Sequence, residues 1–447
     1  FCENLASSAM DFSAHFAQPS LPERLRQLAT LAEDAGVLSS DVYGSAPKLQ
    51  AFEGEVAELL GKQEGAFFIT GTLAQRAALH AHLKLFGSPD SRVFLHPTSH
   101  LVHHDCLRDG EAQAKRARTE AEQRLPGFKC ELVGQFSQAM SAKDCAGLIR
   151  KGDVVVVELP QRCNGGRTMT WEDLQRISAE ARRVGARLHM DGARLWEVQP
   201  YYDRPLHNIC ALFDSVYVSF YKGLGGMSGA MLCSDAATMA DSRDFRTRLG
   251  GSVMALAPIW LDAREQFQSC MQEGFSMRIK KLQEVVRALS EDSAIRSIMC
   301  FEPAEPQACL IHVYLSGTQT KLDAAHTKVK QAAGRTLWNS LRGCGYQIPA
   351  RAASAASLAS DPQSGRARVV VPEPVDQETL VKSCVLSSHV RSCVALMTCV
   401  CHRITKADGD TEQMYFEWNM GPANAKIPTA DFVEAWQAFA RALAEEP

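Results

Sequence analysis

The hydrophobic pattern of this chain alternates between two periods along its first half. Apolar residues recur at helical spacing over residues 21–35 and 48–60, where Leu49, Phe52 and Val56 fall on one stripe. Between the helical stretches lie short runs of branched and aromatic residues, at 66–69, 154–159, 187–190, 215–220 and 229–234. Such runs are typical of strands covered on both faces. The alternation predicts an α/β domain with a mostly parallel sheet.

The pattern loosens after about residue 255 and predicts a second, smaller α+β domain that ends in a helix at 430–446. We expect a cofactor-binding large domain over 41–255 and a small domain over 256–447. The segment 1–40 is expected to join the small domain, and an irregular insertion is expected around 350–410.

Polar residues follow three of the predicted strands. Thr70-Gly71-Thr72 forms a turn between a strand and a helix, where free backbone amides can hold a phosphate. Asp191 and Lys222 each follow a hydrophobic run, and a charge there is unfavourable unless another group meets it. Ligands of such sheets bind beyond the carboxyl ends of the strands, so we expect these residues to surround one ligand.

A phosphate cup, a carboxylate and a lysine are the groups that pyridoxal 5'-phosphate requires. The lysine amine bonds to the cofactor's aldehyde, and the carboxylate keeps a proton on the ring nitrogen. Asp191 and Lys222 would then contact opposite parts of one cofactor. A nicotinamide enzyme is disfavoured because no GxGxxG follows the first strand.

Composition narrows the other possibilities. The chain has 447 residues, 46% of them hydrophobic, and a formal net charge of -3, which disfavours a nucleic-acid partner. No apolar stretch approaches the roughly 20 residues that cross a bilayer, so no membrane partner is expected. The 15 scattered cysteines favour reduced thiols and a cytoplasmic location. Because the chain begins at Phe1 rather than Met, an organellar leader sequence remains an open alternative.

Several stretches resemble, in order, the threonine aldolase and aromatic amino acid β-eliminating lyase family of fold type I pyridoxal phosphate enzymes. They span roughly residues 41–255 and read DVYGSAPKLQAFEGEVAELLGK, FFITGTLAQ, HPTSHLVHHD, the GG of ELPQRCNGG, LHMDGARLWE and SFYKGLGG. The resemblance implies a fold type I large domain, a smaller C-terminal domain and a homo-dimer or homo-tetramer.

The resemblance also implies roles for individual residues. Lys222 matches the lysine that binds the cofactor aldehyde, Asp191 the partner of the ring nitrogen, and His100 the histidine that stacks on the ring. Gly71 and Thr72 match the phosphate-binding pair. We therefore expect Lys222, His100 and Asp191 to be catalytic.

Other matches concern the substrate and the subunit contacts. Arg194 matches the arginine that reaches the phosphate or the substrate carboxylate, and Asp105 stands where the family usually has glutamate. Tyr43 and Arg248 match residues near a neighbouring subunit's site, and Tyr43 is also expected to contact the substrate.

The chain departs from the aldolases of this family at three places. The histidine that assists proton transfer at the β-hydroxyl is replaced by Gln161, which cannot act as a base. The segment MYFEWNMG lacks the arginine that usually binds the substrate carboxylate; Arg162 is either its substitute or a member of a structural ion pair. The usual SDT near the N-terminus is missing.

Two histidine- or cysteine-rich stretches invite a metal interpretation. One holds His96, His100, His103 and His104; the other holds Cys384, Cys393, Cys399, Cys401 and His402. Neither has the ligand spacing of a zinc site, so we expect no metal.

The predicted function is that of a pyridoxal phosphate-dependent carbon–carbon lyase acting on an amino acid, a small-molecule substrate. Retro-aldol cleavage of a β-hydroxy amino acid to glycine and an aldehyde is the leading reaction. The alternatives are β-elimination, transamination or racemisation on the same cofactor, or a non-catalytic binding protein that keeps the fold.

Overall fold

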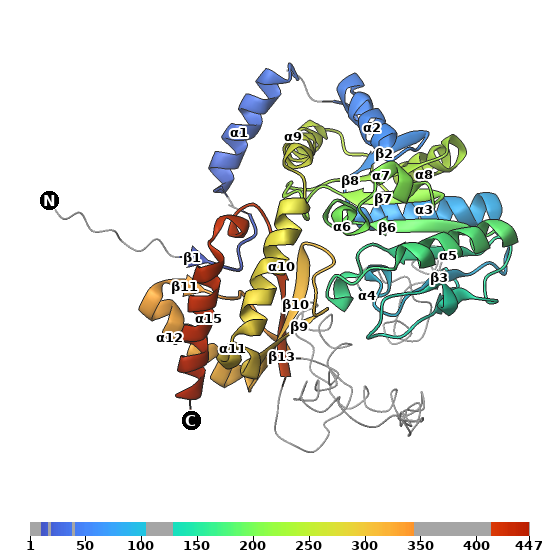
Figure 1. Ribbon diagram of the computed structural model, residues 1–447. Coiled ribbons are helices and arrows are strands. Elements are labelled where there is room, and N and C mark those ends of the chain that lie inside the picture. The colour runs from blue at the N-terminus through green and yellow to red at the C-terminus, as the bar shows by residue number, and fades with distance from the viewer. Residues whose placement is uncertain (1–9, 17–18, 38–40, 104–127, 344–412, 447) are drawn as a thin grey trace, which may run out of the picture.

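The computed structural model describes residues 10–16, 19–37, 41–103, 128–343 and 413–446. Their strands form a seven-stranded sheet and a four-stranded sheet, which lie side by side with helices packed around both (Figure 1). A two-stranded pair, β1 (Met10–Asp11) with β11 (Arg335–Thr336), ties the N-terminal segment to the smaller unit.

The seven-stranded sheet has the order β2-β8-β7-β6-β5-β3-β4. Its strands are β2 (Glu64–Phe68), β3 (Val93–Leu95), β4 (Cys130–Leu132), β5 (Val154–Glu158), β6 (Arg187–Gly192), β7 (Ser215–Ser219) and β8 (Ala230–Ser234). Only β8 runs against the others among the described strands, because both its neighbours pair with it antiparallel. This confirms the predicted α/β class with a mostly parallel sheet.

Helices cover both faces of this sheet. One face packs on α3 (Gly71–Phe86) and α8 (Ala236–Arg248). The other packs on α2 (Pro47–Leu59), α5 (Trp171–Val184), α6 (Leu195–Tyr202), α7 (Leu206–Cys210) and α9 (Ala257–Glu273). Trp260 and Phe267 of α9 share a core with Phe220, so this helix packs on the seven-stranded sheet. The predicted boundary at residue 255 stays a prediction.

The four-stranded sheet is antiparallel and forms the core of the smaller domain. Its order is β12 (Arg342–Gly343), β13 (Gln413–Asn419), β10 (Leu310–Ser316) and β9 (Met299–Glu302). Helices α10 (Ser276–Glu291), α11 (Ser293–Ile298), α12 (Gln319–Ala333) and α15 (Thr429–Ala444) contribute to this domain, and α1 (Leu21–Asp34) contacts α9.

The two faces of the small sheet differ in character because side chains alternate along a strand. Val313, Phe416 and Trp418 belong to the apolar core, together with Trp436 of α15. The alternate residues of β13 include Glu417, whose carboxylate contacts arginines of the larger domain. The small sheet therefore supplies a polar surface to the region where the two domains meet.

Capping residues fix several helix ends. Thr170 caps α5, its Oγ1 accepting a hydrogen bond from the Asp173 N–H at 3.1 Å, and Thr70 caps α3 in the same way through Leu73. Gly61 follows α2 with φ of 64°, a left-handed conformation that favours glycine. These ends fix where the chain leaves each helix for the sheet.

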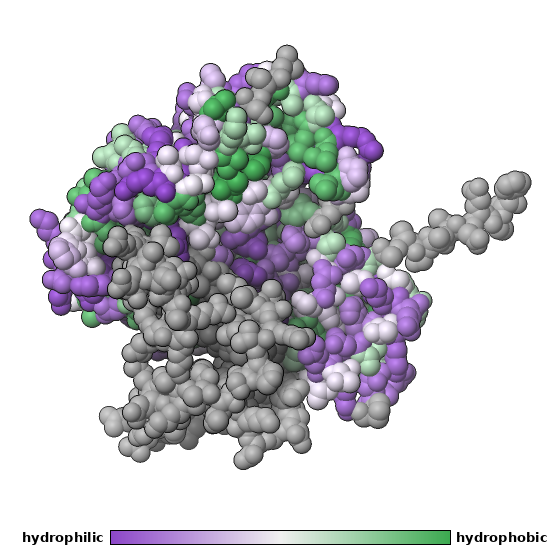
Figure 2. Space-filling model, turned by 180° about the vertical axis from the view of Figure 1, so that it is seen from behind, coloured by the Kyte–Doolittle hydropathy of each residue, from purple (hydrophilic) through white to green (hydrophobic). Residues whose placement is uncertain are grey.

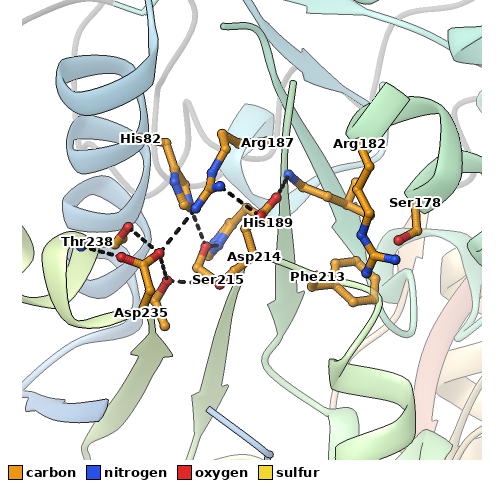
Figure 3. A network of polar contacts seen from close by, with 12 residues as sticks. His82, Ser178, Arg182, Arg187, His189, Phe213, Asp214, Ser215, Asp235 and Thr238 are labelled. Carbon is orange, nitrogen blue, oxygen red and sulfur yellow. Dashed lines mark hydrogen bonds and ion pairs between the residues drawn. The ribbon is translucent and has the colours of Figure 1, made fainter. Parts of the chain in front are cut away.

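A buried polar network braces the amino ends of β6 and β7 (Figure 3). The Ser215 hydroxyl lies between His82 Nε2 at 2.6 Å and His189 Nδ1 at 2.7 Å, while Arg187 bridges Asp214 and Asp235. Burial lowers the pKa of His189 to about 3 and that of His82 well below its usual value, so both rings are neutral. The network fixes the register of two strands whose far ends carry Asp191 and lead to Lys222.

The predicted insertion around 350–410, with its cysteine-rich stretch, lies outside the described residues. No helix within the described ranges has the length and apolar character needed to cross a membrane.

Candidate active site

Asp191 and Lys222 are brought together by neighbouring strands. Asp191 is the penultimate residue of β6 and pairs in register with Tyr217 of β7, and Lys222 follows β7 by three residues. The Asp191 side chain is buried, and its Oδ1 accepts a hydrogen bond from the Ala193 N–H at 3.2 Å. Its Oδ2 has no hydrogen-bond partner among the described residues. A buried acceptor without a partner is unfavourable, so this oxygen is suited to a donor from outside the chain.

The Lys222 amine lies in the electrostatic field of this carboxylate. Burial lowers its pKa below the usual value, the charge of Asp191 raises it, and the charge of Arg194 lowers it again. Burial is the largest of these effects. The lysine therefore holds a neutral, nucleophilic amine at lower pH than a solvent-exposed lysine does.

Gly71 places the start of α3 against β7. A Cβ atom built on Gly71 would lie 2.0 Å from the Tyr217 hydroxyl, so any side chain here would displace the tyrosine. The helix begins at this glycine, and the N–H groups of its first turn have no partners within the helix. Gly71 and Thr72 thus occupy the helix terminus that the sequence predicts for a phosphate.

Glu158 is a site residue that the sequence reasoning missed. It ends β5 beside Asp191, and its carboxylate accepts hydrogen bonds from the backbone N–H groups of His100 and Arg162, both at 3.0 Å. Burial, and then the charge of Asp191, raise its pKa to about 7. The sequence does hold a signal for it: like Asp191, Glu158 is an acidic residue directly after a hydrophobic run, here of four valines.

We expect this carboxyl to make stability depend on pH. Its pKa in the folded protein exceeds the unfolded value of 4.5, so the folded state binds a proton more tightly and loses stability as pH rises between those values. The loss is on the order of 3 kcal/mol. Glu158→Gln cannot titrate. Urea unfolding without cofactor measures the free energy of unfolding of the variant and of wild type. The variant's value minus the wild-type value should increase by that amount between pH 4.5 and 7. An equal difference at pH 5 and pH 8 would contradict this assignment.

Two arginines converge on a carboxylate of the small sheet. Glu417 accepts a hydrogen bond from Arg162 Nε at 2.6 Å and from an Arg194 terminal nitrogen at 3.4 Å. Arg194 also pairs with Glu197 at 3.0 Å. Desolvation raises the pKa of Glu417, but the charges of Arg162 and Arg194 outweigh it and hold the pKa near 2. Glu417 is thus an ionised, mostly buried carboxylate, and it lies in MYFEWNMG, the segment that lacks the usual arginine.

The remaining predicted residues lie outside this cluster. Tyr43 is 58% exposed, and its side chain makes no hydrogen bond to another described residue. Arg248 is exposed and pairs with Asp244 at 2.9 Å. Gln161 is buried, and its Oε1 accepts a hydrogen bond from the Met140 N–H at 3.0 Å. Asp105 lies outside the described residues.

Metal binding finds no support in the described part of the chain. No group of three or more His, Cys, Asp or Glu side chains there is arranged to hold a metal ion. His96, one of the residues considered for zinc, contacts Thr98 at 2.7 Å and the Gln135 carbonyl at 3.1 Å instead. The second stretch considered, around Cys384 to His402, falls in a part that the structure leaves undescribed.

A family model of beta-eliminating lyases matches residues 31–333, about two thirds of the chain. The chain belongs to the beta-eliminating lyase family. Among solved structures, this family member resembles one assigned as an L-allo-threonine aldolase, from Listeria monocytogenes EGD-E. The TM-score is 0.71 at 25% identity, covering 98% of this chain and 97% of the other. The fold is that of fold type I enzymes.

Two curated relatives of this lyase family member have different activities. The aldolase vrtJ of Penicillium aethiopicum is 30% identical over 256 residues, which cover 57% of this chain and 62% of the relative. The alanine racemase TOXG of Cochliobolus carbonum is 30% identical over 269 residues, covering 59% and 65%. The match spans somewhat less than two thirds of the length of each of these relatives.

Proposed function

We propose that this protein is a pyridoxal phosphate-dependent lyase that cleaves a β-hydroxy amino acid to glycine and an aldehyde. The observation that carries the proposal is that the neighbouring strands β6 and β7 bring Asp191 and Lys222 to one edge of the sheet. One is a buried carboxylate whose Oδ2 has no partner among the described residues, and the other is a lysine whose pKa is lowered by burial. Membership of the lyase family and the likeness to an aldolase support the same conclusion.

The residues present fit this cofactor. Oδ2 of Asp191 can accept a hydrogen bond from a protonated ring nitrogen, which satisfies an otherwise unpaired buried acceptor. The amide groups at Gly71 and Thr72 can receive a phosphate, and His100 can stack on the ring. When bound, the cofactor supplies an electron sink for the bonds of the substrate's α-carbon.

Arg162 is suited to hold the substrate's carboxylate. Its Nε is bonded to Glu417, and its terminal nitrogens make no hydrogen bond to another described residue. Since those nitrogens present parallel N–H groups, they can bind a carboxylate in a bidentate manner. Glu158 anchors the backbone of Arg162 and of His100, and so keeps both residues in position.

Proton transfer then falls to Lys222. Gln161 cannot serve as a base, and its carbonyl is already bonded to the Met140 N–H. Burial favours a neutral amine at Lys222, which can take the proton from the β-hydroxyl and return one to the α-carbon. This would let the chain cleave the Cα–Cβ bond without the histidine that Gln161 replaces.

Racemisation is the second candidate function. The likeness to the alanine racemase TOXG supports it, and so does the missing histidine, because a racemase needs a base at the α-carbon and none at a β-hydroxyl. Deuterium exchange at the α-carbon of alanine, with inversion, separates this reaction from cleavage.

The deciding experiment is a visible absorption titration of the cofactor-loaded protein with L-allo-threonine, followed by measurement of glycine and acetaldehyde. We expect a cofactor band that responds to the amino acid and equal amounts of both products. A band with no cleavage, together with inversion of alanine, would favour the racemase. No retained cofactor at all would overturn the proposal and favour a non-catalytic binding protein.

The proposal includes a homo-dimer or homo-tetramer in the cytoplasm. The exposed side chains of Val42, Tyr43 and Met254 support a subunit contact near residues 41–44, because exposed apolar patches mark interaction surfaces. Sedimentation analysis at micromolar concentration measures the assembly directly.

A further inference from the structure

A cavity of about 600 Å³ adjoins the Arg162–Glu417 pair. Its walls come from residues 11–16 of the N-terminal segment, from residues 339–342, and from β13. A Cβ atom built on Gly225 would lie 2.7 Å from the Phe16 ring, so the wall formed by residues 11–16 contacts the loop that carries Lys222. On the face seen in Figure 2, hydrophilic residues gather in the hollow between the two domains.

The cavity is large and polar. Nine of its twelve lining residues are polar, which distinguishes it from the mostly apolar pockets of many ligand sites. Volumes of roughly 300–1,000 Å³ hold molecules of drug size, whereas threonine carries a single methyl group on its β-carbon. The site therefore has room for a much longer side chain than threonine's.

The carboxylates around the cavity are already engaged. Asp11 Oδ1 accepts hydrogen bonds from the Ser13 N–H at 2.9 Å, the Ser13 hydroxyl at 2.6 Å and the Ala14 N–H at 3.1 Å. Glu417 is bonded to Arg162, Arg194 and the Asn419 amide. Glu417 is therefore not a ready partner for a cation or a donor from outside, and Oδ1 of Asp11 is occupied by its own segment.

The arginines, in contrast, keep donors that make no hydrogen bond to another described residue. Arg342 pairs with Tyr415 across β12 and β13, which places it on the same sheet face as Glu417. The Arg342 side chain makes no hydrogen bond or ion pair with another described residue. Burial lowers the pKa of His312 to about 4. The charge of Glu417 raises this pKa and the charges of Arg162 and Arg342 lower it, so both guanidinium groups act on one buried histidine.

We propose that this cavity binds the substrate's side chain, and that this side chain ends in a carboxylate held by Arg342. The inference rests on the proposed function and names the substrate class: a β-hydroxy α-amino acid with an acidic side chain. Cleavage breaks the Cα–Cβ bond, the β-hydroxyl loses its proton to become the aldehyde, and the α-carbon gains a proton. The products are glycine and an aldehyde that carries a carboxylate.

Calorimetric titration of the cofactor-loaded protein with unreactive acids tests this assignment. Glutarate has two carboxylates and pentanoate, of equal length, has one. We expect glutarate to bind about tenfold more tightly or better, because one added charge-assisted contact contributes that much. Arg342→Gln should abolish the preference and Arg342→Lys should keep part of it. Arg296→Gln, an exposed arginine of the same domain outside the cavity, should leave it unchanged.

Equal binding of the two acids would overturn the inference, and so would a preference that survives Arg342→Gln. If Arg342→Gln weakened pentanoate binding as much as glutarate binding, that result would also count against the inference, since it would indicate that the substitution had displaced Arg162. Failure of the proposed function appears elsewhere, as a loaded protein that cleaves no amino acid. The heat of dicarboxylate binding needs no reaction and is measured in either case.

Discussion

Replacing Lys222 by alanine is expected to reduce cleavage by about 10³-fold or more, the loss that follows removal of an essential proton-transfer group. The amine is also the covalent anchor that the proposal assigns to the cofactor. The variant should fold, because an alanine removes a partly desolvated charge whose pKa burial already lowers. The measurement is the rate of aldehyde release per folded molecule at saturating cofactor.

Lys62 offers a matched control. Burial lowers its pKa as well, but its ammonium donates hydrogen bonds to the carbonyl oxygens of Cys210 at 2.9 Å and Phe213 at 2.6 Å. Lys62→Met should lower the free energy of unfolding while leaving the rate per folded molecule intact. Equal rates in Lys222→Ala and wild type would reject the catalytic assignment and leave the scaffold alternative standing.

Replacing Asp191 by asparagine is expected to lower the rate by about 10²- to 10³-fold, as the loss of one preorganised electrostatic group does. The change keeps the shape of the side chain and the acceptor for the Ala193 N–H, and removes only the charge. The free energy of unfolding without cofactor should stay equal or rise, because the carboxylate has an unsatisfied buried oxygen.

Asp262 should show the reverse behaviour. It is equally buried, but it is paired with Arg24 and accepts a hydrogen bond from the Met227 N–H at 2.6 Å. Asp262→Asn should destabilise the fold and spare the rate per folded molecule. The comparison therefore separates a carboxylate kept for chemistry from one kept for structure. A fully active Asp191→Asn variant would exclude its role at the ring nitrogen.

Local pattern predicted the parts of the site that lie at strand ends. Asp191, Lys222 and Gly71 lie at or just beyond the ends of buried strands, and parallel strands of one sheet end at one edge. The pairing of β6 with β7 was not visible in the sequence, yet the order of strand and helix patterns favoured it. The roles of these residues remain proposals, whereas their positions are structural.

What the sequence did not reveal depends on distant contacts. Glu417 stands 255 positions from Arg162, and nothing in the text MYFEWNMG indicates that its glutamate reaches another domain. The wall formed by residues 11–16 was equally hidden, since a short segment with no periodicity carries no packing signal. The spacing of hydrophobic residues indicates which side of a helix or strand faces a core. It does not indicate which charged side chains will contact one another.

The arginine–glutamate cluster has a consequence for turnover. Two positive charges at Arg162 and Arg194 are matched by two negative charges at Glu197 and Glu417, so the cluster is electrically balanced before any amino acid arrives. The carboxylate of an incoming amino acid would therefore bind through its hydrogen-bond geometry, with little net electrostatic attraction. The carboxylate of glycine, which remains after cleavage, would be held as weakly. In the proposed reaction, such a cluster would lower ground-state affinity and speed the departure of glycine, because glycine carries the same carboxylate that the substrate presents.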